Sequence, residues 1–195
     1  MKSSGSIGIA LLLITTSILL VAFDLPQGWI RAGSKYKSYD MGVDPGSGRD
    51  GKNAATIKSI DKKINGFGTL MQSSSPANYL GKRVRMSGYM KTMDVANWAG
   101  LWFRIDQKDS DKRLGFDNMR NGKVDRSIKG TTDWTRYEIV LDVPVNAHNL
   151  AYGALLNGTG QIWFDDIRFE IVDSTIATTG KPLQQVEPSN LDFEK

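Results

Sequence analysis

The stretch from Gly130 to Val172 constrains the fold of this chain more than any other part of it. Its sequence, GTTDWTRYEIVLDVPVNAHNLAYGALLNGTGQIWFDDIRFEIV, holds three apolar segments separated by the polar turns PVNAHN and NGTG. Residues that favour strands recur in each segment with the alternation of period two that a half-buried strand produces. The stretch therefore predicts three successive β-strands, and it contains no recognisable reaction centre.

The chain from Leu25 onward shows the same organisation, with Gly, Asn, Asp and Ser clusters between short apolar segments. No segment carries a long amphipathic helical pattern. Regular short strands with turn signals between them are typical of a β-sandwich or barrel, so we predict an all-β body. The predicted strands are Tyr36–Val43, Ala54–Ile60, Gly66–Gln72, Arg83–Met93, Ala99–Asp106, Leu114–Asp117, Thr135–Val143, Leu150–Leu156 and Gln161–Val172.

Alternation within two of these strands leaves aromatic and charged side chains facing outward. They are Tyr89 and Lys91 in one strand, and Trp102, Arg104 and Asp106 in the other. If the two strands pair, these residues form a common platform, on which sugar C–H faces stack on aromatic rings and charged groups bind the hydroxyls. The alternative is a surface covered by a loop, with Trp102 as a packing residue and Arg104–Asp106 as a cross-strand or solvated pair. The predicted inward residues of three strands are Val84, Met86, Met90, Leu101, Phe103, Ile105, Tyr137, Ile139, Leu141 and Val143.

Two scarce residue types narrow the possible chemistry. The chain has no cysteine and a single histidine, His148, in a polar turn. Disulfides, thiolate metal sites, cysteine nucleophiles and zinc sites built from several histidines are therefore excluded. The 25 basic and 21 acidic residues give a net charge of +4 but are interspersed along the chain. Because they form no concentrated basic patch, we expect no nucleic-acid partner.

An uncharged apolar run of 17 residues, Ile7–Phe23, stands near the start of the chain. Its length lies between a usual signal-peptide core and a full membrane span, and no clean small-x-small cleavage site follows it. Lys2 precedes the run, which favours an N-terminus inside and a body outside. We predict that residues 1–23 are a hydrophobic signal-anchor helix or a cleaved signal peptide. Either one places the body outside the cytoplasm, anchored to the membrane or secreted.

The closing strands follow an ordered set of motifs. A Trp-Thr-x-Tyr step opens an aliphatic strand that ends in Val-Pro, a Gly-rich strand follows, and an aromatic residue precedes Asp-Asp-aliphatic in the last strand. This pattern resembles carbohydrate-binding modules with the galactose-binding-like jelly-roll fold. The resemblance covers residues 25–173, implies a jelly-roll β-sandwich, and is specific for the fold rather than for a ligand. The matching positions are Thr132, Trp134, Tyr137, Val143, Pro144, Asp165, Asp166 and Ile167.

A bacterial version of this fold, often named with transcriptional regulators, is similar at four further motifs. These are Gly81–Arg85, Leu101–Asp106, Phe116–Met119 and Lys129–Trp134. Such domains resemble accessory or sensory modules. No segment of this sequence has a helix-turn-helix pattern to support the regulator label.

The resemblance to carbohydrate-binding modules also implies a structural calcium ion. Asp166 matches the second Asp of the closing Asp-Asp step, which often helps to hold that ion. The partner ligands usually come from Asn-x-x-Phe-Glu near the start of the domain, where this chain reads AFDLPQGW. Such an element stands instead at residues 190–194. We interpret residues 174–195 as the remnant of a following repeat, or as a tail that folds back to supply the missing strand. Apart from this calcium ion, we expect no cofactor.

These features favour a non-catalytic, extracytoplasmic module that binds carbohydrate or a similar polar ligand. Its predicted ligand-binding residues are those of the platform together with Asn118, although Asn and Asp in such loops are most often turn formers. One alternative is a sensory or protein-interaction domain of a membrane-associated regulatory system. Another is a hydrolase built on paired carboxylates. The acids available to such a hydrolase are Asp106, Asp117, Asp165 and Asp166, the last two diverging unless a bulge intervenes.

Overall fold

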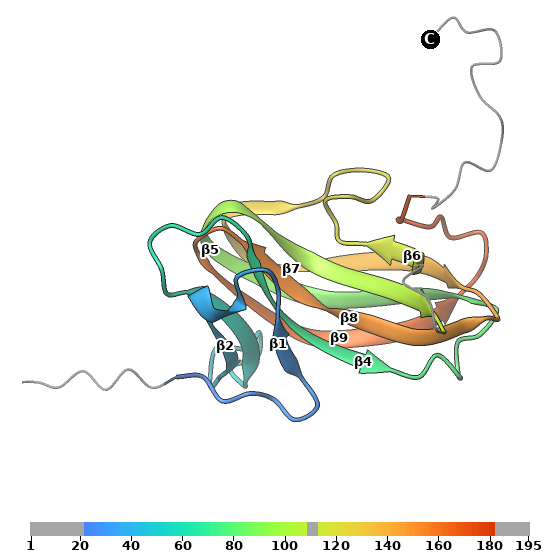
Figure 1. Ribbon diagram of the computed structural model, residues 1–195, viewed down its shortest axis with the longest axis horizontal. Helices are drawn as coiled ribbons and strands as arrows, with labels where there is room; N and C mark the ends of the chain where they lie inside the picture. Colours follow the sequence, from blue (N-terminus) through green and yellow to red (C-terminus); the bar gives the residue numbers. More distant parts are fainter. Residues whose placement is uncertain (1–21, 109–112, 182–195) are drawn as a thin grey trace, which may run out of the picture.

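The computed structural model describes residues 22–108 and 113–181, and most of these residues form β-strands (Figure 1). This confirms the predicted all-β fold. Within the described ranges the helical structure is a single 3-10 turn, η1 (Tyr36–Ser38). The strands are β1 (Ile30–Ala32), β2 (Tyr39–Asp44), β3 (Ala54–Ser59), β4 (Phe67–Ser74), β5 (Lys82–Gln107), β6 (Arg113–Asp117), β7 (Ile128–Val143), β8 (Ala147–Asn157) and β9 (Gln161–Val172).

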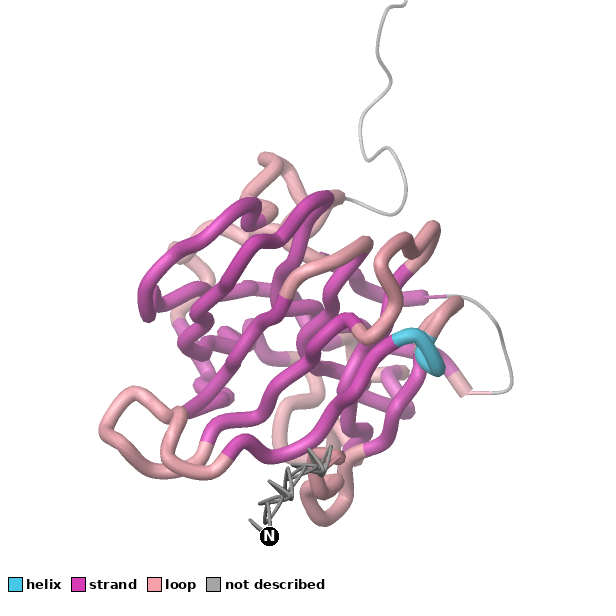
Figure 2. Tube along the Cα trace, turned by 90° about the vertical axis from the view of Figure 1, so that its left-hand side faces the viewer, coloured by secondary structure: helices cyan, strands magenta, loops and turns pink. Residues whose placement is uncertain are grey.

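One long strand, β5, belongs to both layers of the sandwich. It pairs with β9 up to Met93 and with β7 up to Ala99, and it pairs with β8 from Trp98 onward and with β6 from Phe103 onward. The first layer therefore has the order β2-β3-β9-β5-β7, and the second has the order β1-β4-β8-β5-β6. We call them the β9 layer and the β8 layer. Figure 2 shows their strands, in magenta, making up most of the described chain.

The passage of β5 from one layer to the other has a local cause. Its register with β7 shifts three times between Met90 and Ala99. Asp94, inside this stretch, has a φ of 52°, which is rare for a residue other than glycine. Such irregularities bend a strand and increase its twist. The two strands predicted at Arg83–Met93 and Ala99–Asp106 are therefore one bent strand, which corrects the prediction.

The core lies between the two layers and confirms the alternation assigned to β5. The inward residues of both halves of β5 are fully buried, and full burial of such an apolar side chain contributes about 1.5–3 kcal/mol. Tyr137 on β7 is half-buried and packs against the same core. The residues of β5 with 0% exposure in this core are Val84, Met86, Met90, Ala99, Leu101, Phe103 and Ile105.

The first part of the predicted tail packs against the domain. Thr179 N donates to Val140 O at 2.9 Å, and Val140 N donates to Thr179 Oγ1 at 2.9 Å. Gly180 forms a β-bridge with Gly122 in the loop after β6. Residues 174–181 therefore hold β7 and this loop together.

Two predicted segments lie outside the described residues. Residues 1–21, which hold nearly all of the predicted signal-anchor helix, and the Asn-x-x-Phe-Glu element at 190–194 are not among the described residues. In the described ranges, 22–108 and 113–181, no helix has the length and apolar character needed to cross a membrane. The signal-anchor and the origin of the tail stay predictions.

Candidate binding groove and the opposite charged face

The bend in β5 separates the residues predicted to form one platform. Tyr89 and Lys91 lie in the first half of β5, which pairs with β9. Trp102, Arg104 and Asp106 lie in the second half, which pairs with β8. The two halves send their inward residues into the same core, so their outward residues lie on opposite faces of the sandwich. The prediction of a common platform is therefore wrong, and the molecule has two candidate surfaces.

The outer face of the β8 layer carries a groove of about 330 Å³. Large side chains stand beside small ones across neighbouring strands: Trp102 lies opposite Gly153, and Arg104 lies opposite Ala151. This pairing of large with small residues leaves space above the sheet. The lining residues are Ala32, Gly33, Phe67, Thr69, Met71, Trp98, Trp102, Arg104, Arg113, Phe116, Asn118 and Leu155.

Two tryptophans line this groove beside Phe67 and Phe116. Trp102 is 6% exposed, and its indole Nε1 donates to Thr69 Oγ1 at 2.8 Å. That bond fixes the ring, so Trp102 is a packed wall of the groove rather than a free platform. Trp98 is 8% exposed and carries the Arg120 guanidinium 5.3 Å from its ring centroid. Sequence reasoning missed Trp98 because it placed this residue just outside a strand.

Arg104, a charged side chain of the groove, is held by contacts with residues outside the groove. Arg104 Nε lies 2.8 Å from Asp106 Oδ1, and Arg104 Nη2 donates to Asp106 Oδ2 at 3.1 Å. Asn149 Nδ2 donates to the same carboxylate oxygen at 3.0 Å. Of the two ion-pair partners, Arg104 lines the groove and Asp106 does not. Asp106 therefore orients Arg104. Both residues belong to β5 and are partly exposed, so they form a solvated pair within one strand and not a cross-strand pair.

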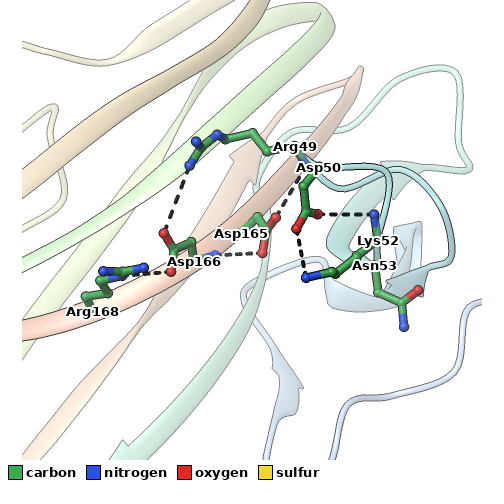
Figure 3. Close-up of a pocket in the computed structure, with 7 residues that line it drawn as sticks. All are labelled: Arg49, Asp50, Lys52, Asn53, Asp165, Asp166 and Arg168. Atoms are coloured by element: carbon green, nitrogen blue, oxygen red, sulfur yellow. Dashed lines mark hydrogen bonds and ion pairs between the residues drawn. The ribbon is translucent and has the colours of Figure 1, made fainter.

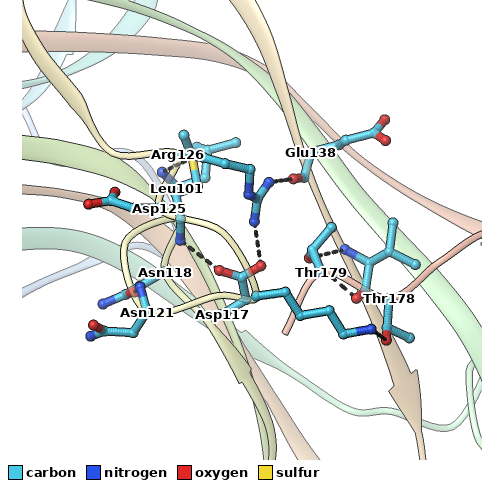
Figure 4. A network of polar contacts seen from close by, with 12 residues as sticks. Leu101, Asp117, Asn118, Asn121, Asp125, Arg126, Glu138, Thr178 and Thr179 are labelled. Atoms are coloured by element: carbon cyan, nitrogen blue, oxygen red, sulfur yellow. Dashed lines mark hydrogen bonds and ion pairs between the residues drawn. The ribbon is translucent and has the colours of Figure 1, made fainter. Parts of the chain in front are cut away.

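The loop after β6 contributes Asn118 to the groove, and Figure 4 shows the polar network that holds this loop. Asp117, with 0% exposure, accepts a hydrogen bond from Met119 N at 2.7 Å and pairs with the Arg126 guanidinium. Arg126 also donates to Glu138 O at 2.6 Å. Asn118 Oδ1 accepts from Asn121 N at 2.7 Å. The turn-forming role of these Asn and Asp side chains is confirmed, and the same turn places Asn118 on the groove.

On the opposite face, contacts within the protein occupy Tyr89 and Lys91. The Arg49 guanidinium lies 3.6 Å from the Tyr89 ring centroid, and Lys91 Nζ lies 5.1 Å from that of Trp163. Beside them is a broad hollow of about 850 Å³, lined mainly by charged side chains (Figure 3). This face is a network of ion pairs and cation–π contacts.

A bulge in β9 gives the two neighbouring aspartates of the closing step their positions. The register with β5 shifts between Ser87 and Tyr89, and Asp166 has a φ of 53°. Asp165 and Asp166 consequently line the same hollow. Arg168 Nε donates to Asp166 Oδ1 at 2.8 Å, an interaction that raises the pKa of the Arg168 guanidinium. The bulge thus prevents the divergence expected of a regular strand.

The described residues around Asp166 do not by themselves form a calcium site. Calcium requires six to eight oxygen ligands, usually including several carboxylates. No cluster of three or more His, Cys, Asp or Glu side chains able to hold a metal occurs in residues 22–108 and 113–181. Two guanidiniums, those of Arg49 and Arg168, already pair with the Asp166 carboxylate. Calcium binding at Asp166 stays a prediction.

Comparison with known proteins gives one curated relative. No family model matches the chain. The chain is 40% identical over 173 residues to a Bacillus subtilis (strain 168) protein named "Uncharacterized HTH-type transcriptional regulator YbfP". The match covers 87% of this chain and 57% of that protein, so the chain spans little more than half of the relative's length.

Solved structures with the same fold include carbohydrate-binding modules. The CBM22-1 xylan-binding domain of Paenibacillus barcinonensis Xyn10C matches 77% of this chain over 89% of its own length, with a TM-score of 0.50 and 16% identity. The enzymatically active domain of bacteriophage CBA120 tailspike protein 4 matches 75% of this chain over 20% of its own length, with a TM-score of 0.55 and 9% identity. The chain therefore has the galactose-binding-like jelly-roll fold found in carbohydrate-binding modules.

Proposed function

We propose that this chain is a non-catalytic carbohydrate-binding domain that holds its ligand in the groove of the β8 layer. The observation that carries the proposal is the pair Trp98 and Trp102 beside Arg104 and Asn118, in a fold shared with a xylan-binding domain. Of the residues predicted to bind the ligand, we assign Trp102, Arg104 and Asn118 to the groove. Asp106 acts through Arg104, and Tyr89 and Lys91 belong to the other face.

The groove has the composition that recognition of a sugar requires. Aromatic rings pack against the apolar faces of a pyranose, while a few fixed polar groups orient its hydroxyls. Its volume of about 330 Å³ is near the lower end of the range for ligand sites, about 300–1,000 Å³. This size suits a short stretch of a saccharide chain better than a large ligand.

The positions of the acidic residues support binding without catalysis. Hydrolysis by paired carboxylates needs two of them facing each other across the scissile bond, within about 10 Å. Asp106 is paired with Arg104, and Asp117 is buried against Arg126. Asp165 and Asp166 lie on the opposite face of the sandwich. Among the described residues, these acids therefore form no pair across the groove.

The proposed location is outside the cytoplasm. The apolar run Ile7–Phe23, with Lys2 before it, supports either a membrane anchor or a secretion signal. A polysaccharide of the cell surface or its surroundings is the ligand class that fits this location.

The test compares matched variants on the two faces. Affinity electrophoresis of the purified chain in gels with soluble xylan, mixed-linkage glucan or galactan should show retardation by at least one of them. Trp98→Ala and Arg104→Ala should each weaken binding about tenfold, since one stacking or charged contact contributes about 1–2 kcal/mol. Lys91→Ala, on the opposite face, is the control and should bind like the unaltered chain. Thermal melting establishes that each variant is folded. Binding that survives both groove substitutions would contradict the proposal.

A second function is favoured by the relative from Bacillus subtilis, whose name describes a transcriptional regulator. In this alternative the domain is the sensory or protein-interaction part of a membrane-associated regulatory system. Purification of the tagged chain from membranes, followed by mass spectrometry, tests it. A stoichiometric membrane-protein partner, together with no retardation by any glycan, would favour this function over the first.

A further inference from the structure

A short side chain surrounded by long ones creates a small hollow in the β9 layer. Ser87, on the first half of β5, faces outward in register with Glu138 on β7 and Arg168 on β9. Along its own strand it is flanked by the outward residues Arg85 and Tyr89. Because serine is much shorter than these four neighbours, the sheet has a depression at this point. Its volume is about 270 Å³.

Ser87 forms the floor of this hollow, and its hydroxyl has no hydrogen-bond partner among the described residues. It is 2% exposed and lines the hollow. None of the side-chain hydrogen bonds between described residues involves its Oγ, although Thr56 and Thr92, also buried on strands, both have hydrogen-bond partners. Ser87 Oγ is not among the buried polar atoms left without a partner in the described residues, so it is open to the hollow. There it is available to donate a hydrogen bond to a small polar molecule.

Three guanidiniums surround the hollow with unused donors. Arg168 Nε donates to Asp166 at 2.8 Å, and Arg136 Nη1 donates to Glu138 at 2.9 Å. The Arg49 guanidinium lies 3.6 Å from the Tyr89 ring centroid and comes no closer than 4.0 Å to its ion-pair partner Asp166. Each guanidinium has five N–H donors, so these contacts hold the side chains in place and leave most donors available.

The charge around the hollow has the sign that an anion needs. Its lining contains three arginines against two carboxylates, those of Asp166 and Glu170, which leaves one positive charge. Guanidinium groups bind carboxylate, sulfate and phosphate oxygens through paired, charge-assisted hydrogen bonds. A single oxyanion would balance the charge and would also accept a hydrogen bond from Ser87.

We propose that this hollow is a second binding site, specific for an oxyanion, with Ser87 on its floor and Arg49, Arg136 and Arg168 as its donors. It is independent of the carbohydrate groove, because the two lie on opposite faces of the sandwich. The oxyanion can belong to an acidic saccharide or to a phosphate- or sulfate-bearing molecule.

The test is a titration of the purified chain, at low ionic strength, followed by NMR of the arginine Nε–Hε signals. The probes are glucuronate, inorganic sulfate and inorganic phosphate, with glucose as the uncharged control. Saturable shifts of the Arg136 and Arg168 signals are expected with at least one anion and none with glucose. The tightest probe identifies the source: glucuronate indicates an acidic saccharide, and sulfate or phosphate the corresponding ester.

Variants distinguish the hollow from general attraction of anions. Ser87→Val puts two methyl groups on the floor of the hollow in place of the hydroxyl and should abolish saturable binding, whereas Ser87→Ala keeps the space and should weaken binding only a few-fold. Arg168→Gln should weaken it about tenfold, the value of one charge-assisted contact. Trp98→Ala in the groove should have no effect, so failure of either site is seen separately. Absence of saturable binding, or binding kept by a folded Ser87→Val variant, would overturn the proposal.

Discussion

The two outer faces of this sandwich are built on the same strand and differ in how they are held. On the β8 layer, the second half of β5 carries Trp98 and Trp102, which are nearly buried and packed against apolar neighbours. On the β9 layer, the first half carries Tyr89 and Arg85, and the charged side chains there pair across strands while remaining partly exposed. Packing preorganises the first face, and solvent-accessible ion pairs organise the second.

This difference shows how one bend determines the chemistry of two surfaces. If β5 were straight and regular, Tyr89 and Trp102 would face opposite sides of a single sheet, because they are an odd number of residues apart. The register shifts between Met90 and Ala99 instead move the second half of the strand into the other layer. Aromatic and cationic residues that look contiguous in the sequence are thereby assigned to separate surfaces.

The largest expected loss of stability comes from breaking the ion pair between Arg126 and Asp117, behind the groove. Arg126→Gln leaves the Asp117 carboxylate, which is 0% exposed, without its cationic partner. Removing one member of a buried ion pair costs about 3–5 kcal/mol. Urea denaturation should show a loss of stability in this range. A loss below 1 kcal/mol would mean that this loop is no more firmly held than the charged face.

Removal of the hydrogen bond that fixes Trp102 should cause an intermediate loss of stability. Thr69→Val removes the acceptor of the Trp102 indole N–H, and it also removes the bond from Thr69 Oγ1 to Ala154 O at 2.7 Å. A buried donor left without a partner costs about 1–3 kcal/mol. The free energy of unfolding should fall by this amount, and glycan binding should weaken because the ring is less well fixed. Thr69→Ser, which keeps the hydroxyl, is the control and should preserve the binding.

The hydroxyl of Tyr39 gives a test that depends on pH. It donates to Gly158 O at 2.8 Å and lies 3.2 Å from Gly66 O, and burial raises the pKa of Tyr39 from 10.0 to about 12. In the unfolded chain the phenol loses its proton near pH 10, whereas in the folded chain it keeps it. Its contribution to stability is therefore complete below pH 10 and is lost as the pH rises toward 12.

Tyr39→Phe removes this ionisation as well as the hydrogen bond. At pH 8 the variant should be less stable than the unaltered chain by about 1 kcal/mol. The difference should shrink as thermal melting is repeated between pH 10 and 12. A difference that stays constant over this range would contradict the assigned pKa.

The smallest loss of stability is expected from a substitution on the charged outer face of the β9 layer. Arg136→Gln removes ion pairs of Arg136 with Glu138 at 2.9 Å and Glu170 at 4.0 Å, and the Arg136 side chain is 42% exposed. Pairs of this kind contribute about 0–1 kcal/mol, because solvent screens them. Urea denaturation should detect little change, and salt should reduce it further. A loss as large as that of Arg126→Gln would remove the distinction between the two faces.

Much of the fold could be predicted because it depends on local pattern. Alternation identified the fully buried residues Met86, Leu101 and Phe103, and it gave the bounds of β9 without error. β1 was missed, since a strand of three residues is too short to show alternation. The Asp-Asp bulge could be named only as an exception to the regular strand, because it depends on pairing with β5.

The candidate site was predictable only in part for the same reason. Trp102, Arg104 and Asn118 were identified from their residue types, and the structure brings all three to one groove. Grouping Tyr89 and Lys91 with them assumed that the two segments of β5 pair. Which layer a strand joins is decided by contacts distant in the sequence, and a pattern of period two carries no information about them.

The most direct test of the two-face account is a matched measurement of glycan affinity for Trp98→Ala and Lys91→Ala, on the glycan that retards the unaltered chain most strongly. The account predicts that Trp98→Ala weakens binding about tenfold while Lys91→Ala leaves it unchanged. Equal affinities for the two folded variants, or a loss confined to Lys91→Ala, would contradict the assignment of the carbohydrate site to the β8 layer.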